Sequence, residues 1–337
     1  MTLVHLHLHR RRTGVTRHVE DVVRALAPAG ARAFGWALGP EVPRTTLFGL
    51  WRAARRGELV LHVHRNLELL FALALRGLTR GVRVVWTRHG AGSPSRWTAA
   101  LAARAEVRVT LTEEGQRTLG LLSVVVPHGV DVHAFRPPAD RAVAWTTLGL
   151  GGERGVAVVG RIRPAKGQGE AVAALARTLP DAPAWRGVLV GEARGPDAAW
   201  LTSLLRLGEG RVRAVGQQQD IRRWYQGATV VLQPSHAESF SLVLVEAMAS
   251  GCCVVAARLP HYGALLEEGR TGFTYPPGDA SALADVLRPL LREPERAAQV
   301  GQAAAEAART RFPLEREVAA LERLYRGGER ECASCTF

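Results

Sequence analysis

Residues 229–257 read TVVLQPSHAESFSLVLVEAMASGCCVVAA, and their pattern predicts a buried strand, a short loop, a buried helix and a second buried strand. Pro234 ends the first apolar run, because proline cannot donate to a sheet ladder. Ser239 or Ser241 can cap the helix, and Gly251 can end it. This strand–helix–strand unit is typical of a parallel α/β sheet, and it decides the fold class of the chain.

Two carboxylates in this unit need partners. Glu246 is the only charged residue among the apolar and small residues of the helix, and an unpaired buried charge costs several kcal/mol. Glu238 lies in the loop before the helix, at the carboxyl end of a strand, where parallel sheets bind ligands. The alternative, that both are surface charges, is disfavoured by their apolar neighbours.

The composition limits the class of protein. A chain of 337 residues is too long for one ordinary core and suits two α/β domains of about 150 residues each. No apolar run approaches the roughly 20 residues of a membrane-spanning helix, and the N-terminus lacks a signal-peptide pattern. The four cysteines make no disulfide framework. We therefore expect a folded protein of the reducing cytoplasm.

The basic residues are unevenly distributed. Residues 1–145 contain 21 Arg and 10 Asp or Glu, a net charge of +11, whereas the remainder contributes +2. A basic first half indicates an anionic partner: a membrane surface, an acidic lipid or polysaccharide, or nucleic acid. Nucleotide bias explains arginine in place of lysine but does not explain the difference between the halves. Lys166 is the single lysine, against 43 arginines.

The rest of the chain repeats the alternation of strand and helix. The expected strands are 3–8, 59–63, 82–86, 107–111 and 124–126, then 156–159, 188–190, 212–215, 230–232 and 253–256. Apolar strands separated by helical segments predict parallel sheets, with the polar residues collected at the strand ends.

The turn-forming residues divide the chain. Residues 1–140 are expected to form a first domain and 154–311 a second, with the Pro- and Gly-rich segment around 137–153 as the linker. The final helix, 312–326, is long enough to cross back to the first domain. Residues 327–337 are expected to be a flexible tail, because Cys332 and Cys335 make only half of a zinc site.

Three features of the first domain are candidates for binding. Gly14 lies between a strand and a helix, as in phosphate-binding loops, but one glycine can equally serve a turn. His5, His7 and His9 alternate along a strand and could bind a metal; without accompanying acidic residues or cysteines, lining a cleft or packing is favoured. The basic, amphipathic segment 47–56 could lie on a membrane or pack on its sheet.

The second half combines Gly160-Arg161, Lys166-Gly167, Glu238 and the run EAMASG that begins at Glu246. This combination resembles the retaining glycosyltransferases of family 4, whose GT-B fold has two Rossmann-like domains facing each other across a cleft. The likeness runs from Thr13-Gly14 to about Arg326. A more particular resemblance is to bacterial lipopolysaccharide-core mannosyltransferases. It rests on the segments 12–16, 64–68, 160–163 and 224–225.

The resemblance implies a nucleotide-sugar site in the second domain. Arg161 and Lys166, five residues apart across a turn, can both reach the diphosphate, Arg as a fork and Lys as a point charge. The backbone at the start of the helix would support the same phosphate, through Ser239, Phe240, Ser241 and Leu242. No Asp-x-Asp metal site is evident, and two cations with a helix terminus can replace a divalent ion. We therefore expect neither a metal nor another cofactor.

The resemblance also implies roles for the remaining candidates. Glu246 would bind the ribose hydroxyls, Glu238 would contact the donor sugar near its reacting carbon, and His89 would hydrogen-bond that sugar. Gly14 would belong to the donor site. Whether Glu238 acts as a nucleophile or only stabilises the reacting sugar stays open. Ser241 stands where the family usually has glycine, and His128 where it often has asparagine; we interpret His128 as structural.

The expected function is retaining, metal-independent transfer of a hexose, with mannose from GDP-mannose as first choice. The expected acceptor is an envelope glycolipid or polysaccharide, such as lipopolysaccharide core, and the expected place is the inner face of the cytoplasmic membrane. The alternatives are a transferase of the same fold that uses UDP-glucose or UDP-N-acetylglucosamine, and a sugar-nucleotide epimerase. A nucleic-acid-binding protein is suggested by the pI near 11, but the sequence lacks its usual motifs.

Overall fold

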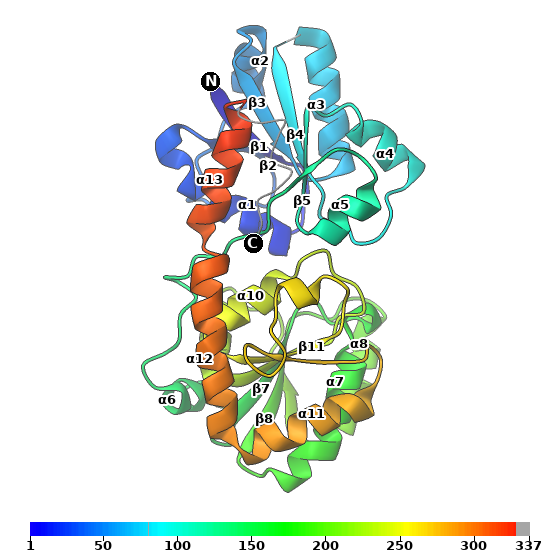
Figure 1. Ribbon diagram of the computed structural model, residues 1–337, viewed down its shortest axis with the longest axis vertical. Helices are drawn as coiled ribbons and strands as arrows, with labels where there is room; N and C mark the ends of the chain where they lie inside the picture. The colour runs from blue at the N-terminus through cyan, green and yellow to red at the C-terminus, as the bar shows by residue number, and fades with distance from the viewer. Residues whose placement is uncertain (80, 328–337) are drawn as a thin grey trace. The chain divides into compact units, whose positions relative to one another are not determined.

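The computed structural model describes residues 1–79 and 81–327, which fall into two units (Figure 1). Unit 1 comprises Met1–Gly129 and the segment that begins at Leu314, and unit 2 comprises Val130–Pro313. Each unit contains one six-stranded parallel sheet with connecting helices. The two parallel sheets that the sequence predicts are therefore confirmed.

The sheet of unit 1 has the order β2-β1-β3-β4-β5-β6. Its strands are β1 (Thr2–His7), β2 (Arg32–Gly35), β3 (Leu59–Val63), β4 (Val82–Thr87), β5 (Val107–Thr110) and β6 (Val124–Val125). The helices are α1 (Gly14–Ala25), η1 (Ala27–Ala29), α2 (Leu47–Arg55), α3 (Asn66–Thr79), α4 (Arg96–Ala102), α5 (Glu113–Leu119) and α13 (Leu314–Tyr325). The order reverses between β1 and β3, and the carboxyl ends at such a reversal are where doubly wound sheets bind ligands.

Helices cover both faces of this sheet, which explains why β3 is buried along its whole length. Leu61 and its alternate neighbours pack into the core on one face, and Val60 into the core on the other. The second core includes Leu321 and Leu324 of α13, which packs beside α1 (Figure 1). Unit 1 is therefore built from two segments that are far apart in the chain.

The sheet of unit 2 has the order β12-β11-β10-β7-β8-β9. Its strands are β7 (Arg154–Val159), β8 (Trp185–Val190), β9 (Val212–Ala214), β10 (Ala228–Gln233), β11 (Cys253–Ala257) and β12 (Phe273–Tyr275). The helices are α6 (Arg141–Thr146), η2 (Pro164–Lys166), α7 (Gln168–Thr178), η3 (Leu179–Asp181), α8 (Asp197–Leu207), α9 (Arg222–Gly227), α10 (Leu242–Ala249), η4 (Tyr262–Ala264), α11 (Ala280–Arg292) and α12 (Pro294–Arg311). The predicted strand–helix–strand unit of residues 229–257 is β10, α10 and β11.

The boundary between the units differs from the expected one. The first unit ends at Gly129 rather than at residue 140, and residues 137–153 contain α6 and belong to unit 2. The Arg141 guanidinium donates to five backbone carbonyls, three where α9 leads into β10 and two just after α10. Trp145 is buried against Gly155, where a Cβ would lie 2.0 Å from the indole ring. These contacts attach the Pro- and Gly-rich segment to unit 2.

The helix expected at 312–326 is α13, and its residues belong to unit 1. The expected tail and its pair Cys332 and Cys335 lie outside the described residues from 328 onward. Two strands have no counterpart among the sequence expectations, β2 and β12. Both are edge strands of three or four residues.

Candidate active site

The site residues of unit 2 follow two neighbouring strands, β7 and β10. These are the first and fourth strands of the unit in chain order, but they pair in the sheet, so the strand order reverses between them. The loop after β7 carries Arg161 and Lys166, and the loop after β10 carries Glu238. Their side chains therefore start from the place where a doubly wound sheet binds ligands.

The two loops are fixed to each other by backbone contacts. His236 N–H donates to the Ala165 carbonyl at 3.3 Å. Gly167 adopts φ +69°, and a Cβ at this position would lie 1.9 Å from the Pro234 carbonyl oxygen. No other residue fits here without moving one loop, so Gly167 determines how closely the loop of Lys166 approaches the loop of Glu238.

Lys166 and Glu238 form an ion pair. Lys166 Nζ lies 2.5 Å from Glu238 Oε1, and the two side chains are 24% and 17% exposed. Gln233, a buried residue at the end of β10, donates from Nε2 to the same oxygen at 3.0 Å. The Glu238 carboxylate is thus oriented by two donors. The role of Gln233 was not predicted from the sequence.

Arg161 is not part of this ion pair. Its side chain is 46% exposed, and its guanidinium lies 3.7 Å from Asp197, the first residue of α8. The sequence placed Arg161 and Lys166 on one diphosphate. The structure brings Lys166 to Glu238 and leaves the Arg161 side chain at the surface of unit 2, with one long ion pair.

The N-terminus of α10 is close in sequence to Glu238. Ser241 is the N-cap residue, and its Oγ accepts from Leu244 N–H at 3.3 Å. Its φ is +86°, a left-handed conformation that costs a non-glycine residue roughly 1–3 kcal/mol. This conformation explains why glycine suits the position. Phe240 is buried against Phe312, whereas Ser239 and Leu242 are half-buried.

Glu246 has the partner that its burial requires. Glu246 is a buried residue of α10, and Tyr225 donates its hydroxyl proton to Glu246 Oε2 at 2.8 Å. Tyr225 is fully buried at the end of α9. Tyr225 and Glu246 are 21 positions apart in the sequence and lie in different helices, so the periodicity of either helix does not indicate that they pair.

Gly14 and His89 belong to unit 1. Gly14 is exposed at the first position of α1, and a Cβ there would meet no atom within 4 Å. His89 follows β4 and is half-buried; its Nε2 lies 3.0 Å from His64 Nδ1, and its Nδ1 lies 3.3 Å from His128 Nε2. Burial, and next the nearby His128, hold the pKa of His89 well below its usual value, so the ring is neutral near pH 7.

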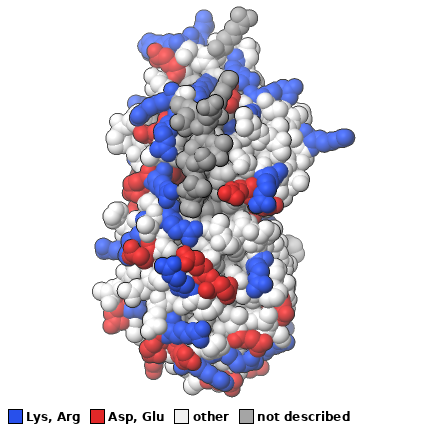
Figure 2. All heavy atoms as spheres, in the orientation of Figure 1, with Lys and Arg blue, Asp and Glu red and all other residues white. Residues whose placement is uncertain are grey.

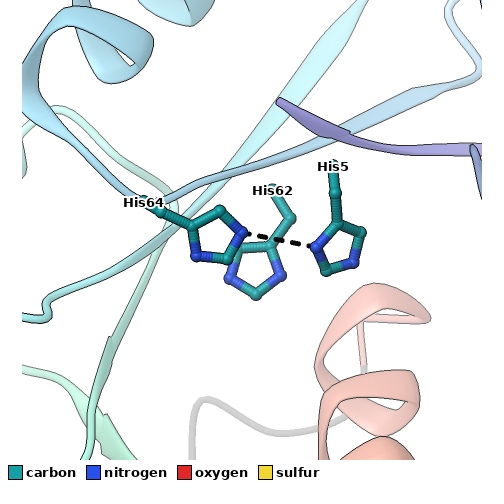
Figure 3. A group of neighbouring side chains, drawn as sticks. All are labelled: His5, His62 and His64. Atoms are coloured by element: carbon teal, nitrogen blue, oxygen red, sulfur yellow. Dashed lines mark hydrogen bonds between the residues drawn. The ribbon is translucent and has the colours of Figure 1, made fainter. Parts of the chain in front are cut away.

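The alternating histidines His5 and His7 of β1 and His9, two residues after it, are not brought together as one metal group, the less favoured of the two sequence interpretations. His9 is partly exposed and bonds to Arg11, and His7 bonds to Thr16 Oγ1 at 3.0 Å. His5 instead faces His62 and His64, from β3 and the residue that follows it (Figure 3). His64 was not predicted as a site residue, and its contact with His5 spans 59 positions.

Comparison with known proteins identifies the family. Residues 153–293 match the family described as glycosyl transferases group 1. Over 330 residues, the chain is 31% identical to the lipopolysaccharide core biosynthesis mannosyltransferase LpcC of Rhizobium leguminosarum bv. viciae, with 94% of this chain and 93% of the relative covered. The chain belongs to the group 1 glycosyltransferases.

A second relative of this glycosyltransferase is the lipopolysaccharide core biosynthesis mannosyltransferase LpsB of Rhizobium meliloti strain 1021. It is 28% identical, and the match covers 94% of each chain. Among solved structures, Anabaena HepE in complex with UDP and glucose superposes with a TM-score of 0.85 at 22% identity, over 97% of this chain and 100% of HepE. The predicted family and the predicted GT-B fold are confirmed. None of the helices in residues 1–79 and 81–327 has both the length and the apolar character needed to cross a membrane.

Proposed function

We propose that this glycosyltransferase moves a hexose, with retention of configuration, from a nucleotide sugar to the lipopolysaccharide core, and that its donor is GDP-mannose. The observation that carries the proposal is the Lys166–Glu238 ion pair at the carboxyl ends of β7 and β10. The acceptor and the sugar are supported by the two relatives named lipopolysaccharide core mannosyltransferases, which match 94% of this chain.

The chemistry explains the choice of Lys166. Breaking the bond between the anomeric carbon and the phosphate oxygen leaves both bonding electrons, and so negative charge, on the nucleoside diphosphate. A lysine ammonium has three N–H donors, so Lys166 can keep its bond to Glu238 and donate to the departing phosphate. The Arg161 side chain is exposed, and its ion pair with Asp197 is long at 3.7 Å, so the guanidinium can leave Asp197 and donate two hydrogen bonds to a phosphate.

The N-terminus of α10 supports the same phosphate. The first-turn N–H groups of a helix lack intrahelical acceptors, and the helix dipole stabilises an anion bound there by roughly 0.3–1 kcal/mol. Ser239, Phe240, Ser241 and Leu242 supply this backbone. With these donors and two cationic side chains, we propose that transfer requires no divalent metal.

The carboxylates have separate tasks in this proposal. Tyr225 holds one oxygen of Glu246, and the carboxylate accepts hydrogen bonds from the ribose hydroxyls. Glu238, fixed by Lys166 and Gln233, orients the donor sugar and stabilises positive charge at its anomeric carbon. The acceptor hydroxyl attacks the face that the phosphate leaves and passes its proton to that phosphate.

The proposed acceptor is bound to a membrane, and α2 provides a surface that fits one. Leu47 and Phe48 are 57% and 72% exposed, Trp51 is 37% exposed, and Arg52 and Arg55 are exposed on the same helix. Exposed aromatic residues beside arginines are typical of helices that lie on anionic bilayers. Basic and acidic side chains are interspersed on the face drawn in Figure 2, so the proposal rests on α2 rather than on one continuous basic patch.

The choice of donor is tested by transfer assays with GDP-mannose, UDP-glucose and UDP-N-acetylglucosamine, using lipopolysaccharide core as acceptor, with and without EDTA. We expect transfer from GDP-mannose that EDTA does not reduce. Thermal stability provides a second readout, since a nucleotide at 100 times its dissociation constant adds ~2.7 kcal/mol. Stabilisation by UDP but not by GDP would show that the donor is a UDP-sugar instead. If no donor is transferred and none is slowly hydrolysed, the proposed reaction is overturned.

A further inference from the structure

Unit 1 contains a continuous series of hydrogen-bonded side chains, which we call the histidine row. Its members come from β1, β3, β4, the segments that follow β3, β4 and β6, and α13. They are Thr87, His62, Tyr325, His5, His64, His89, His128 and Glu317, in the order in which they are bonded. Figure 3 shows His5, His62 and His64 pointing toward one another.

The row reaches the surface at one member. The side chains of the other seven belong to residues that are buried, whereas His89 is half-buried. Burial lowers the pKa of every histidine in the row, to about 3 for His5 and to about 4 for His128. Each ring is therefore neutral near pH 7, and a neutral imidazole carries its proton on one nitrogen only.

This restriction fixes the direction of each bond, starting at α13. A carboxylate can only accept, so His128 carries its proton on Nδ1 and donates it to Glu317 Oε1, 3.1 Å away. His128 Nε2 is then an acceptor, and His89 must donate to it from Nδ1. His89 Nε2 is an acceptor in turn, and His64 donates to it from Nδ1.

The remaining bonds agree with this direction. His64 Nε2 accepts from His5 Nδ1 at 3.4 Å, the longest distance in the row. His5 Nε2 accepts the Tyr325 hydroxyl proton, and the Tyr325 oxygen accepts from His62 Nδ1 at 2.6 Å. His62 Nε2 accepts from Thr87. All five histidines therefore share the Nδ1–H tautomer, and no bond in the row joins two donors or two acceptors.

We propose that Glu317 is a positioning residue that holds His89 in the Nδ1–H tautomer through His128. In this state the one in-plane lone pair of His89 is on Nε2 and accepts from His64 Nδ1 at 3.0 Å, so a ligand that bonds there has to displace His64 and donate a proton in its place. A sugar hydroxyl can do this, and a phosphate oxygen cannot. The assignment of the ligand as the donor sugar rests on the proposed function, whereas the tautomer does not.

A metal ion is the competing explanation for these residues. His5, His62 and His64 form one potential ligand group, and His18, His128 and Glu317 form another. His62 is a poor ligand, since each of its nitrogens already lies 2.6 Å from a hydroxyl. A metal on His128 Nδ1 would place the His128 proton on Nε2 and reverse the direction of the row.

The tautomers are measurable by long-range ¹H–¹⁵N correlation spectra of the full chain with labelled histidine. For the wild type near neutral pH we expect Nδ1–H at His89 and His128. Nε2–H at His89, or one equivalent of zinc in the purified protein by elemental analysis, would overturn the proposal. This measurement needs neither a variant nor a substrate.

Glu317→Gln tests the cause. Glu317 Oε2 accepts from the Gly129 backbone N–H at 2.7 Å, and that donor cannot change; Oε1, which faces His128, also lies 2.9 Å from His18 Nε2. The glutamine oxygen should face Gly129, which leaves the two amide N–H groups to face His128 and His18. We expect His128 and His89 to switch to Nε2–H. Tyr325→Phe is the matched control, because it removes a hydroxyl that is separated from His89 by His5 and His64 and should leave both tautomers unchanged.

The kinetics separate this inference from the proposed function. Glu317→Gln should lower kcat roughly 10-fold, as expected for one misdirected hydrogen bond, without changing stabilisation by the nucleotide. Unchanged His89 tautomers in folded Glu317→Gln would refute the inference even if transfer activity is present. A wild type that shows the Nδ1–H tautomer but transfers no sugar would refute the proposed function alone.

Discussion

At the scale of single residues, the Glu238 carboxylate depends on charge from another part of the chain. Lys166 lies 72 positions away and contacts Oε1, the oxygen that Gln233 also contacts. Gln233 ends β10 and Lys166 lies in the loop that follows β7, so the orientation of Glu238 follows from the pairing of β7 with β10. A change at Lys166 should therefore affect the reaction more than the fold.

We expect Lys166→Ala and Glu238→Gln each to lower kcat/KM by about 10²–10³-fold, the range for removal of one oriented electrostatic group. Both side chains are partly exposed, so the free energy of unfolding should change little. Steady-state kinetics and chemical denaturation measure the two effects. Arg154→Ala is the control, because the ion pair of Arg154 within residues 1–79 and 81–327 is with the exposed Glu153. Wild-type rates in both site variants would exclude this site.

Ser241 permits a prediction about stability. Ser241→Gly should raise the free energy of unfolding by about 1 kcal/mol, because glycine adopts φ +86° without strain. Its loss as an N-cap residue relative to serine is only about a few tenths of a kcal/mol. Ser241→Ala should lower it by about 1 kcal/mol, because alanine keeps the strain and loses the bond to Leu244. Equal stability of the two variants in chemical denaturation would contradict the strain at this position.

At the scale of elements, α2 should bind anionic membranes. We expect the protein to sediment with vesicles that contain anionic lipid and not with zwitterionic vesicles. Arg52→Gln and Arg55→Gln should each make the free energy of vesicle binding less favourable by about 1 kcal/mol. Phe48→Ser should lower the vesicle-binding constant roughly 10-fold. Leu207→Ser is the control: it removes an apolar side chain that is 47% exposed on α8, and binding should not change. Equal binding to both kinds of vesicle would rule out this surface.

The elements also show how far the sequence predicts the fold. The apolar run of β10, the cap at Ser241 and the end at Gly251 were sufficient to locate one strand–helix–strand unit. The edge strands β2 and β12 have too few residues for any periodicity to emerge. The helix α6 was not predicted because its flanking prolines and glycines are typical of linkers; its place depends on the contacts of Arg141 and Trp145 with unit 2.

At the scale of the whole molecule, the sequence located the ends of the strands but not the partners that meet there. Glu238 and Glu246 were predicted as candidates from the position of charge among apolar residues. Tyr225 and Gln233 were not, because neither residue type is unusual in its local context. The contact between His128 and Glu317 spans 189 positions, and no local pattern encodes such a distance.

The buried histidines predict acid sensitivity of the whole chain. The pKa of His5 is lowered to about 3, and those of His7 and His128 to about 4, chiefly by burial. Between these values and the usual 6.5, the unfolded chain binds protons that the folded chain does not. The free energy of unfolding should therefore fall as the pH falls, by about 1.4 kcal/mol per pH unit for each such histidine.

Denaturation midpoints at pH 7.5, 6.0 and 5.0 measure this loss. Glu317 changes stability in the same direction: its own burial raises the pKa of its carboxyl, but the nearby His18 and His128 together lower it by more, so the net pKa lies below the usual value and protonation at low pH favours the unfolded chain. His133→Gln, at an exposed position, should leave the pH dependence unchanged. A stability that does not vary between pH 7.5 and 5.0 would contradict the neutral, buried state of these rings.

The placement of α13 has a consequence for how this protein is made. Most of unit 1 precedes unit 2 in the chain, but Leu321, Leu324 and Tyr325 of its core are translated only after all of unit 2. At 5–20 residues per second, synthesis of unit 2 takes roughly 10–40 s. During that time the nascent unit 1 exposes the apolar sheet face that α13 later covers. Of the two units, the one whose synthesis begins earlier is therefore completed later, and we expect chaperones to bind its exposed apolar face during translation.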